Sequence, residues 1–238
     1  MQFVQNTKKN KNFKLQTLNF KLLFVPLASL ICISSQMEQP IEHSPWSENI
    51  IIADADYADR VAFNLIVNFE RMIGRRIPQA DMAQWLVCIA LDGGLRTPSD
   101  THVVLLHNRD RSRLENFTPS QFDTELNGQA FRDDQLGEFT ISAVTAEDQL
   151  VSHDDLLLDI VGTALQQPEV KRVMIVPNAE EGTLYDDLRE TLRRQDADDK
   201  RVTVFTMEPL QGGNFRQEML GYSLMAALGI RSDELANG

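Results

Sequence analysis

Short runs of hydrophobic residues alternate along the chain with segments in which hydrophobic residues recur every three or four positions. The runs have the length and the Val and Ile content of strands that are buried on both faces of a sheet. They span residues 49–53, 102–107, 138–144, 172–176 and 201–205. The helical spacing predicts helices over residues 57–73, 79–91, 154–165, 184–194 and 215–228.

This order of elements predicts an α/β fold, because strand–helix–strand connections make neighbouring strands parallel and place helices on both faces. We expect a three-layer α/β/α sandwich with a mainly parallel sheet of five strands. Residues 108–134 interrupt the alternation, since they are polar and irregular. Within them a short helix is expected at 120–126.

The pattern of hydrophobic positions separates one folded domain from the segments that flank it. Residues 48–230 are expected to form a single domain, followed by a C-terminal tail at 231–238. Residues 37–47 hold two prolines and no periodicity, which predicts a flexible tail. A composition of 42% hydrophobic and 24% charged residues excludes a disordered or fibrous chain.

Charge is divided unevenly along the chain. The formal net charge is −12, but the first 36 residues hold five lysines and no acid. All 35 acidic residues therefore lie in residues 37–238, whose formal charge is −17. Such a charge argues against non-specific binding to nucleic acid or to anionic membranes, which both need a positive surface.

Residues 1–36 form a leader with two interpretations. The uncharged run at 22–34 is too short to span a bilayer, and with the preceding lysines it resembles a signal peptide, which implies a periplasmic or secreted protein. Alternatively, the change from Lys to Arg usage after residue 36 favours Met37 as the true start and a cytoplasmic protein. In either case no membrane span is expected in the mature domain.

Several types of site are excluded by missing motifs. No Gly-rich nucleotide-binding fingerprint follows any strand, no Ser-His-Asp arrangement is visible, and the four histidines lack metal-ligand spacing. Cys88 lies in a hydrophobic helical segment and is interpreted as a buried structural thiol.

Acidic residues follow three of the predicted strands, where an α/β sheet binds its ligands. They are Asp54, Asp56, Asp154, Asp155, Asp159, Glu180 and Glu181. Clustered carboxylates repel one another, and a cation such as Mg²⁺ or Mn²⁺ relieves that repulsion. Most of these acids also suit the first turn of a helix, where they stabilise its dipole. Asp54 is the least easily explained in that way, because it ends a buried strand.

Three arginines after the second strand are candidate phosphate-binding residues. Arg109, Arg111 and Arg113 alternate with Asp110 and Ser112. They would contact phosphates, and RNA in particular, despite the acidic domain; the alternative is a solvated loop.

Four stretches resemble the PIN-like superfamily, especially its NYN branch of metal-dependent ribonucleases. They are residues 50–56, 154–159, 173–178 and 200–205. The resemblance implies a metal held by Asp54, Asp155, Asp159 and Glu181, with Asp54, Asp159 and Glu181 catalytic. The chain departs from the family pattern where Ala179 replaces an expected acid and Tyr57 an expected Asn.

A weaker resemblance links Asp54-Ala55-Asp56 to haloacid-dehalogenase-like phosphatases, although the Thr expected two residues later is Ala58. Three hypotheses on function remain open. The first is metal-dependent hydrolysis of RNA phosphodiesters. The second is a non-catalytic module with a degraded site that binds a protein partner, and the third is phosphomonoester hydrolysis.

Overall fold

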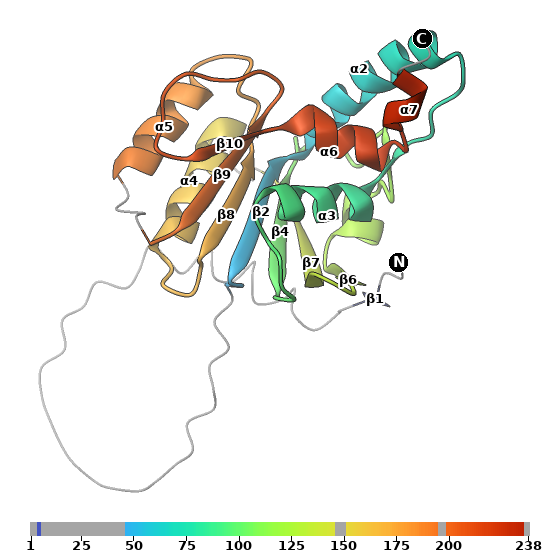
Figure 1. Ribbon diagram of the computed structural model, residues 1–238. Helices are drawn as coiled ribbons and strands as arrows, with labels where there is room; N and C mark the ends of the chain where they lie inside the picture. Colours follow the sequence, from blue (N-terminus) through green and yellow to red (C-terminus); the bar gives the residue numbers. More distant parts are fainter. Residues whose placement is uncertain (1–3, 6–45, 146–150, 195–198, 236–238) are drawn as a thin grey trace, which may run out of the picture.

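The computed structural model describes residues 4–5, 46–145, 151–194 and 199–235 (Figure 1). Apart from two residues, the expected leader at 1–36 lies outside the described residues, as does most of the expected tail at 37–47. Within the described ranges, none of the helices has both the length and the hydrophobicity needed to cross a bilayer.

The five predicted strands all form and lie parallel in one sheet. They are β2 (Asn49–Asp54), β4 (Thr101–Leu106), β7 (Gly137–Val144), β8 (Arg172–Val176) and β9 (Arg201–Thr206). β2 is central, with β4 and then β7 on one side and β8 and then β9 on the other. The predicted α/β class and the mainly parallel sheet are confirmed.

The predicted number of five strands is wrong, because polar strands extend the sheet at both edges. β6 (Gln129–Asp133) pairs antiparallel with β7, and β10 (Arg216–Met219) pairs parallel with β9, which makes seven strands. The two-residue segment β1 (Val4–Gln5) adds to the β6 edge. β10 is largely polar, and β6 has only two buried hydrophobic residues, Ala130 and Phe131, so both lack the hydrophobic run by which interior strands are predicted.

Helices cover both faces of the sheet. α2 (Ala55–Ile73), α3 (Met82–Asp92) and α6 (Leu220–Ala227) pack on one face; α4 (His153–Gln166) and α5 (Leu184–Arg194) pack on the other. The helix predicted at 215–228 is shorter, because its first residues form β10. Each face of the sheet has its own hydrophobic core, and alternate residues of β2 point into one or the other. Ile51 packs in the core on the α2 side, and Ile50 packs in the core on the α4 side.

Short elements complete the fold. The helix expected at 120–126 is η1 (Phe122–Leu126), a single π-helical turn, and β3 (Ala80–Asp81) pairs with β5 (Phe117–Thr118). α7 (Ser232–Leu235) lies in the segment expected to be a tail. Its Glu234 binds Arg75, just beyond α2, at 2.8 Å.

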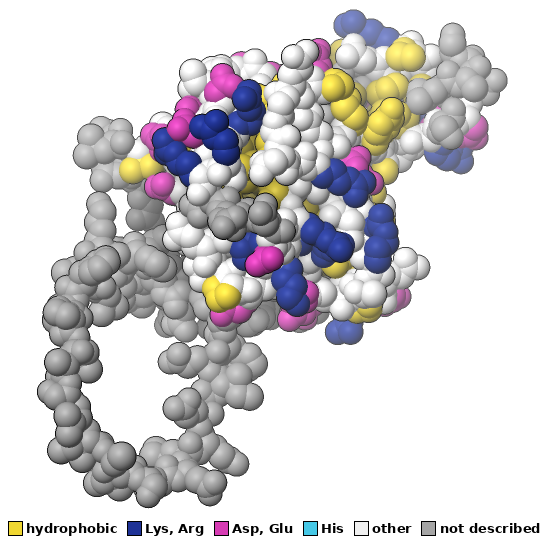
Figure 2. Space-filling model, turned by 60° about the vertical axis from the view of Figure 1, so that its left-hand side comes forward, with side chains coloured by type: hydrophobic (Ala, Val, Ile, Leu, Met, Phe, Trp, Pro, Cys, Tyr) yellow, Lys and Arg dark blue, Asp and Glu magenta, His cyan; other side chains and the backbone are white. Residues whose placement is uncertain are grey.

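The second half of α2 projects beyond the sheet, with α7 near its end (Figure 1). Its first turns are buried, and it ends at Gly74, whose φ of 72° is the left-handed conformation that glycine adopts most easily. Phe63 and Met72 on this helix, and Tyr222 on α6, are exposed. In Figure 2, hydrophobic side chains gather at this end of the molecule, while charges of both signs mix elsewhere on the visible face.

The central position of β2 predicts that its core residues dominate stability. Ile51 is fully buried, so Ile51→Ala is expected to lower the free energy of unfolding by about 2–5 kcal/mol. Met72→Ala removes an exposed side chain and is expected to change it by less than about 0.5 kcal/mol. Urea unfolding followed by circular dichroism measures both, and equal effects would contradict the assignment of the core.

Candidate functional site

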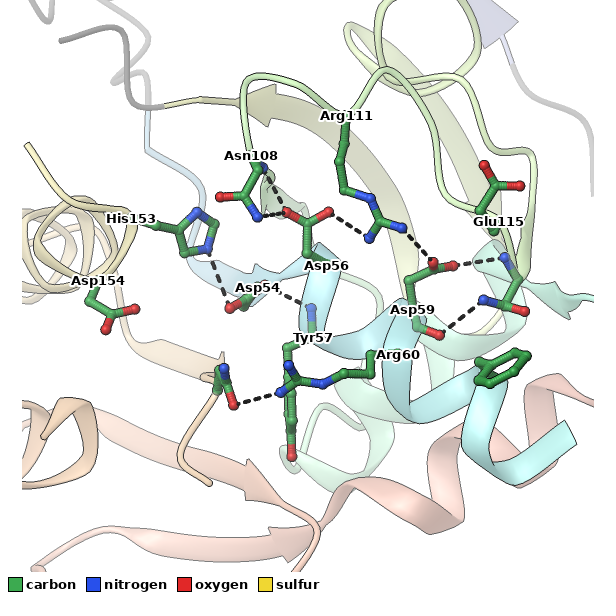
Figure 3. A pocket seen from close by; sticks show the side chains of 13 residues that line it. Asp54, Asp56, Tyr57, Asp59, Arg60, Asn108, Arg111, Glu115, His153 and Asp154 are labelled. Carbon is green, nitrogen blue, oxygen red and sulfur yellow. Dashed lines mark hydrogen bonds and ion pairs between the residues drawn. The ribbon is translucent and has the colours of Figure 1, made fainter. Parts of the chain in front are cut away.

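A pocket of about 750 Å³ lies where β2, β4 and β8 end, at the carboxyl edge of the sheet (Figure 3). From β2 and α2 it is lined by Asp54, Asp56, Tyr57, Asp59, Arg60 and Phe63. The other lining residues are Asn108, Arg111, Glu115, Asn116, His153, Asp154 and Asn178. Five carboxylates face two arginines and one histidine, so the pocket is negatively charged.

Asp54 is both the last residue of β2 and the cap of α2. One carboxylate oxygen accepts a hydrogen bond of 2.9 Å from the backbone N–H of Tyr57, which satisfies a free donor of the first helical turn. The other oxygen lies 3.3 Å from Nε2 of His153, at the start of α4. Asp54 is only 5% exposed, so this carboxylate is held by two different elements.

His153 and Asp154 bring the first turn of α4 into the pocket. Contact with Asp54 raises the pKa of His153, although burial acts in the opposite direction. Burial raises the pKa of Asp154, and the negative charge of Asp54 raises it further. Figure 3 shows Asp154 beside His153, on the side of the pocket opposite Arg111. The two carboxylates therefore repel each other across a shared space.

A second group of acids, on α2, is neutralised by the loop after β4. Asp56 accepts hydrogen bonds from the backbone N–H of Asn108 at 2.7 Å and from its side-chain amide at 2.6 Å. Arg111 contacts Asp56 at 3.2 Å and Asp59 at 3.7 Å. Asp59 is 2% exposed and accepts a 2.7 Å hydrogen bond from the backbone N–H of Asn116. These contacts fasten the loop to α2.

The side of the pocket near β8 carries a third set of contacts. Arg60 donates to the side chain of Asn178 at 3.1 Å and lies 3.3 Å from the exposed Glu181. The Tyr57 hydroxyl donates to Glu180 at 3.0 Å. Burial, together with the charge of Glu180, raises the pKa of Tyr57, which therefore keeps its proton.

The structure brings only some of the predicted site residues together. Asp54 and Arg111 line the pocket, whereas Asp155, Asp159, Glu181, Arg109 and Arg113 do not. Asp155 accepts a 2.8 Å hydrogen bond from Ser152, and Asp159 is exposed one turn further along α4. Arg113 pairs with Glu115 at 2.9 Å. In the described ranges, no three carboxylate, histidine or cysteine side chains are grouped so as to hold a metal ion.

Sequence reasoning counted Asp56 and Asp154 among the acids at strand ends but did not assign them to the site, and it gave Asp59 and His153 no role there. Asp59 follows Asp56 at the spacing of one helical turn, which was a usable signal that both acids face the same way. His153 and Asp154 are adjacent in the sequence, but nothing in the sequence indicates that this pair, rather than Asp155, lines the pocket with Asp54. Both acids of the phosphatase-like pair are engaged within the chain: Asp56 by Asn108 and Arg111, and Asp54 by the Tyr57 N–H and His153.

Comparison with known proteins identifies one family. A family model described as a family of unknown function (DUF6621) matches residues 43–235. The chain belongs to this family. The match covers the whole sheet from β2 to β10 and every residue of the pocket. No curated protein and no solved structure matches the chain.

The buried Asp59 is expected to matter more for stability than the exposed Asp159. Asp59→Ala leaves the Asn116 N–H without its acceptor and removes one of the two carboxylates that Arg111 contacts, which should lower the free energy of unfolding by about 1–3 kcal/mol. Asp159→Ala should change it by less than about 0.5 kcal/mol. Urea titrations of both variants test this. A smaller loss for Asp59→Ala than for Asp159→Ala would show that the loop is not fastened in this way.

The contact between His153 and Asp54 predicts a pH dependence in metal-free protein. Because the folded pKa of His153 is raised above 6.5, its contribution to stability is complete below pH 6.5 and is lost as pH rises through the folded pKa. The other charges near its ring are Asp56 and Asp154. NMR titration should give His153 a pKa above 6.5 that falls in Asp54→Asn. An unchanged value in that variant would contradict the contact.

Proposed function

We propose that the pocket hydrolyses phosphodiester bonds of RNA with the help of Mg²⁺ or Mn²⁺, as the resemblance to PIN-like ribonucleases implies. The observation that carries the proposal is the meeting of Asp54, from the end of β2, and Asp154, from the start of α4, in one pocket at the carboxyl edge of the sheet. An RNA substrate accords with the cytoplasmic location expected for a chain that starts at Met37.

The acids of the pocket that could hold such a cation are Asp54 and Asp154, not the full set that the resemblance implied. The oxygens of Asp56 and Asp59 are engaged by Arg111 and its loop, and Glu181 pairs with Arg60. Asp154 lines the same pocket as Asp54, and burial and the charge of Asp54 raise its pKa while His153 acts in the opposite direction. Mg²⁺ at phosphoryl-transfer sites is often held by one or two carboxylates, with water and substrate phosphate completing its shell. Asp54 and Asp154 would supply these carboxylates. Both oxygens of Asp54 already have partners, the Tyr57 N–H and His153, so the cation would replace the contact with His153.

When bound, such a cation supplies charge neutralisation at the phosphoryl oxygens and makes a bound water more acidic. The chain itself supplies the other parts of the reaction. His153 lies 3.3 Å from Asp54 in the same pocket, where its imidazole in the protonated form can donate a proton to the leaving oxygen. Arg111 is held at the pocket by Asp56 and Asp59 and retains exposed N–H groups for a phosphate.

A second candidate function is a non-catalytic module that binds a protein partner. It is favoured by the observation that Asp56 and Asp59 are neutralised within the chain and that Asp155, Asp159 and Glu181 lie apart from Asp54. Ala179, where the family pattern has an acid, agrees with this alternative.

Calorimetric titration with Mn²⁺ separates the two candidates. Wild-type protein is expected to bind Mn²⁺, and Asp54→Asn and Asp154→Asn are each expected to weaken binding at least about tenfold by removing a charged ligand. Asn is also a good helix cap, so Asp54→Asn keeps the start of α2 intact.

The matched control is Asp159→Asn, which removes the same charge from a residue of α4 that does not line the pocket and should leave Mn²⁺ binding unchanged. The wild type and Asp159→Asn should cleave single-stranded RNA equally fast, and Asp54→Asn and Asp154→Asn should cleave it more slowly. Cleavage should stop when EDTA is added. Absence of Mn²⁺ binding, or equal weakening by Asp159→Asn, would contradict the proposed site and favour the non-catalytic module.

A further inference from the structure

Phe63 is an exposed aromatic residue that lines the otherwise polar pocket. Its side chain is 53% exposed, although a phenyl ring is normally buried. The other strongly exposed hydrophobic residues of the described chain, among them Met72 and Tyr222, do not line the pocket. The exposed ring of Phe63 therefore suggests a contact with the molecule that the pocket binds.

Helical geometry places Phe63 in line with the charged residues of the pocket. Asp56, Arg60 and Phe63 follow one another at intervals of four and three residues, so they share one face of α2. With a rise of 1.5 Å per residue, Phe63 lies about 10 Å beyond Asp56 along the helix axis. Arg60 lies between them, and its guanidinium also covers the ring of Tyr57 at 5.5 Å. The face thus passes from carboxylate to guanidinium to an apolar ring.

We propose that Phe63 is the surface on which an unpaired base of the substrate stacks while the adjacent phosphate lies over Asp54 and Asp154. This inference rests on the proposed function, and it gives Phe63 the role of selecting unpaired nucleotides. A base in a duplex is already stacked on both faces, so only an unpaired or terminal base can use the ring.

The charge of the domain supports a stacking contribution. With a formal charge of −17 in residues 37–238, and only Arg60 and Arg111 in the pocket, few phosphates can be neutralised. Affinity for a single strand must then come largely from contacts that do not depend on charge, and stacking is such a contact. Binding should therefore depend weakly on salt: two phosphate contacts give a slope of log K against log salt of about −1.4.

A short single-stranded RNA that carries 2-aminopurine tests the inference in the full chain. Stacking quenches the fluorescence of this base, which gives a readout independent of cleavage. We expect quenching with the wild type and with Phe63→Trp, and an affinity about tenfold lower, without quenching, for Phe63→Ala. Met72→Ala is the matched control, because Met72 is 57% exposed on the same helix but outside the pocket. It should behave as the wild type does.

An RNA with one abasic position completes the test. If Phe63 stacks on that base, removing the base and removing the ring cost the same affinity, and the double change costs no more than either alone. Additive losses, equal losses for Phe63→Ala and Met72→Ala, a steep salt slope, or no RNA binding by the wild type would each overturn the inference.

The two proposals fail in distinguishable ways. The proposed function fails when Mn²⁺ is not bound, whatever Phe63 does. The inference alone fails when Phe63→Ala binds and cleaves RNA as the wild type does, with Asp54 and Asp154 still required. A change in oligomeric state of Phe63→Ala, seen by light scattering, would assign the ring to a protein interface and also overturn it.

Discussion

The burial of β2 between β4 and β8 is the constraint on which the site depends. All six residues of this strand are buried, and its backbone pairs with a parallel strand on each side. Its last residue, Asp54, therefore carries a carboxylate into a region with little water. Such a group needs partners, and it finds them in the first turn of α2 and in His153 of α4. The pocket lies where these three elements meet.

The remaining acids of the pocket show how repulsion between carboxylates is limited in an acidic domain. The loop after β4 returns across α2 and gives Asp56 and Asp59 an arginine, an amide and two backbone N–H groups. Asp154 shares the pocket with Asp54, and its pKa is raised by burial and by the charge of Asp54, while His153 acts in the opposite direction. The pocket therefore combines one neutralised group of acids with one pair that a cation would stabilise, and the phenyl ring of Phe63 borders it.

Interior strands and most helices could be predicted from the sequence because burial on both faces demands continuous hydrophobic residues, as in Val173 to Val176. The edge strands could not. β10 is Arg-Gln-Glu-Met, and it forms because β9 offers free backbone groups beside it. The same limit applies to the site. Asp155 and Asp159 have the residue type of metal ligands, but only packing decides that Asp154 lines the pocket with Asp54 while Asp155 binds Ser152.

By itself, the sequence determined the α/β class, the parallel direction of the central strands and the position of Asp54 at a strand end, since each follows from local hydrophobicity and element order. The tertiary structure decided which distant side chains meet: Asp54 with His153, and Arg111 with Asp56 and Asp59. These contacts join segments more than fifty residues apart. They depend on how helices and loops dock on the sheet, which no local pattern of residues specifies.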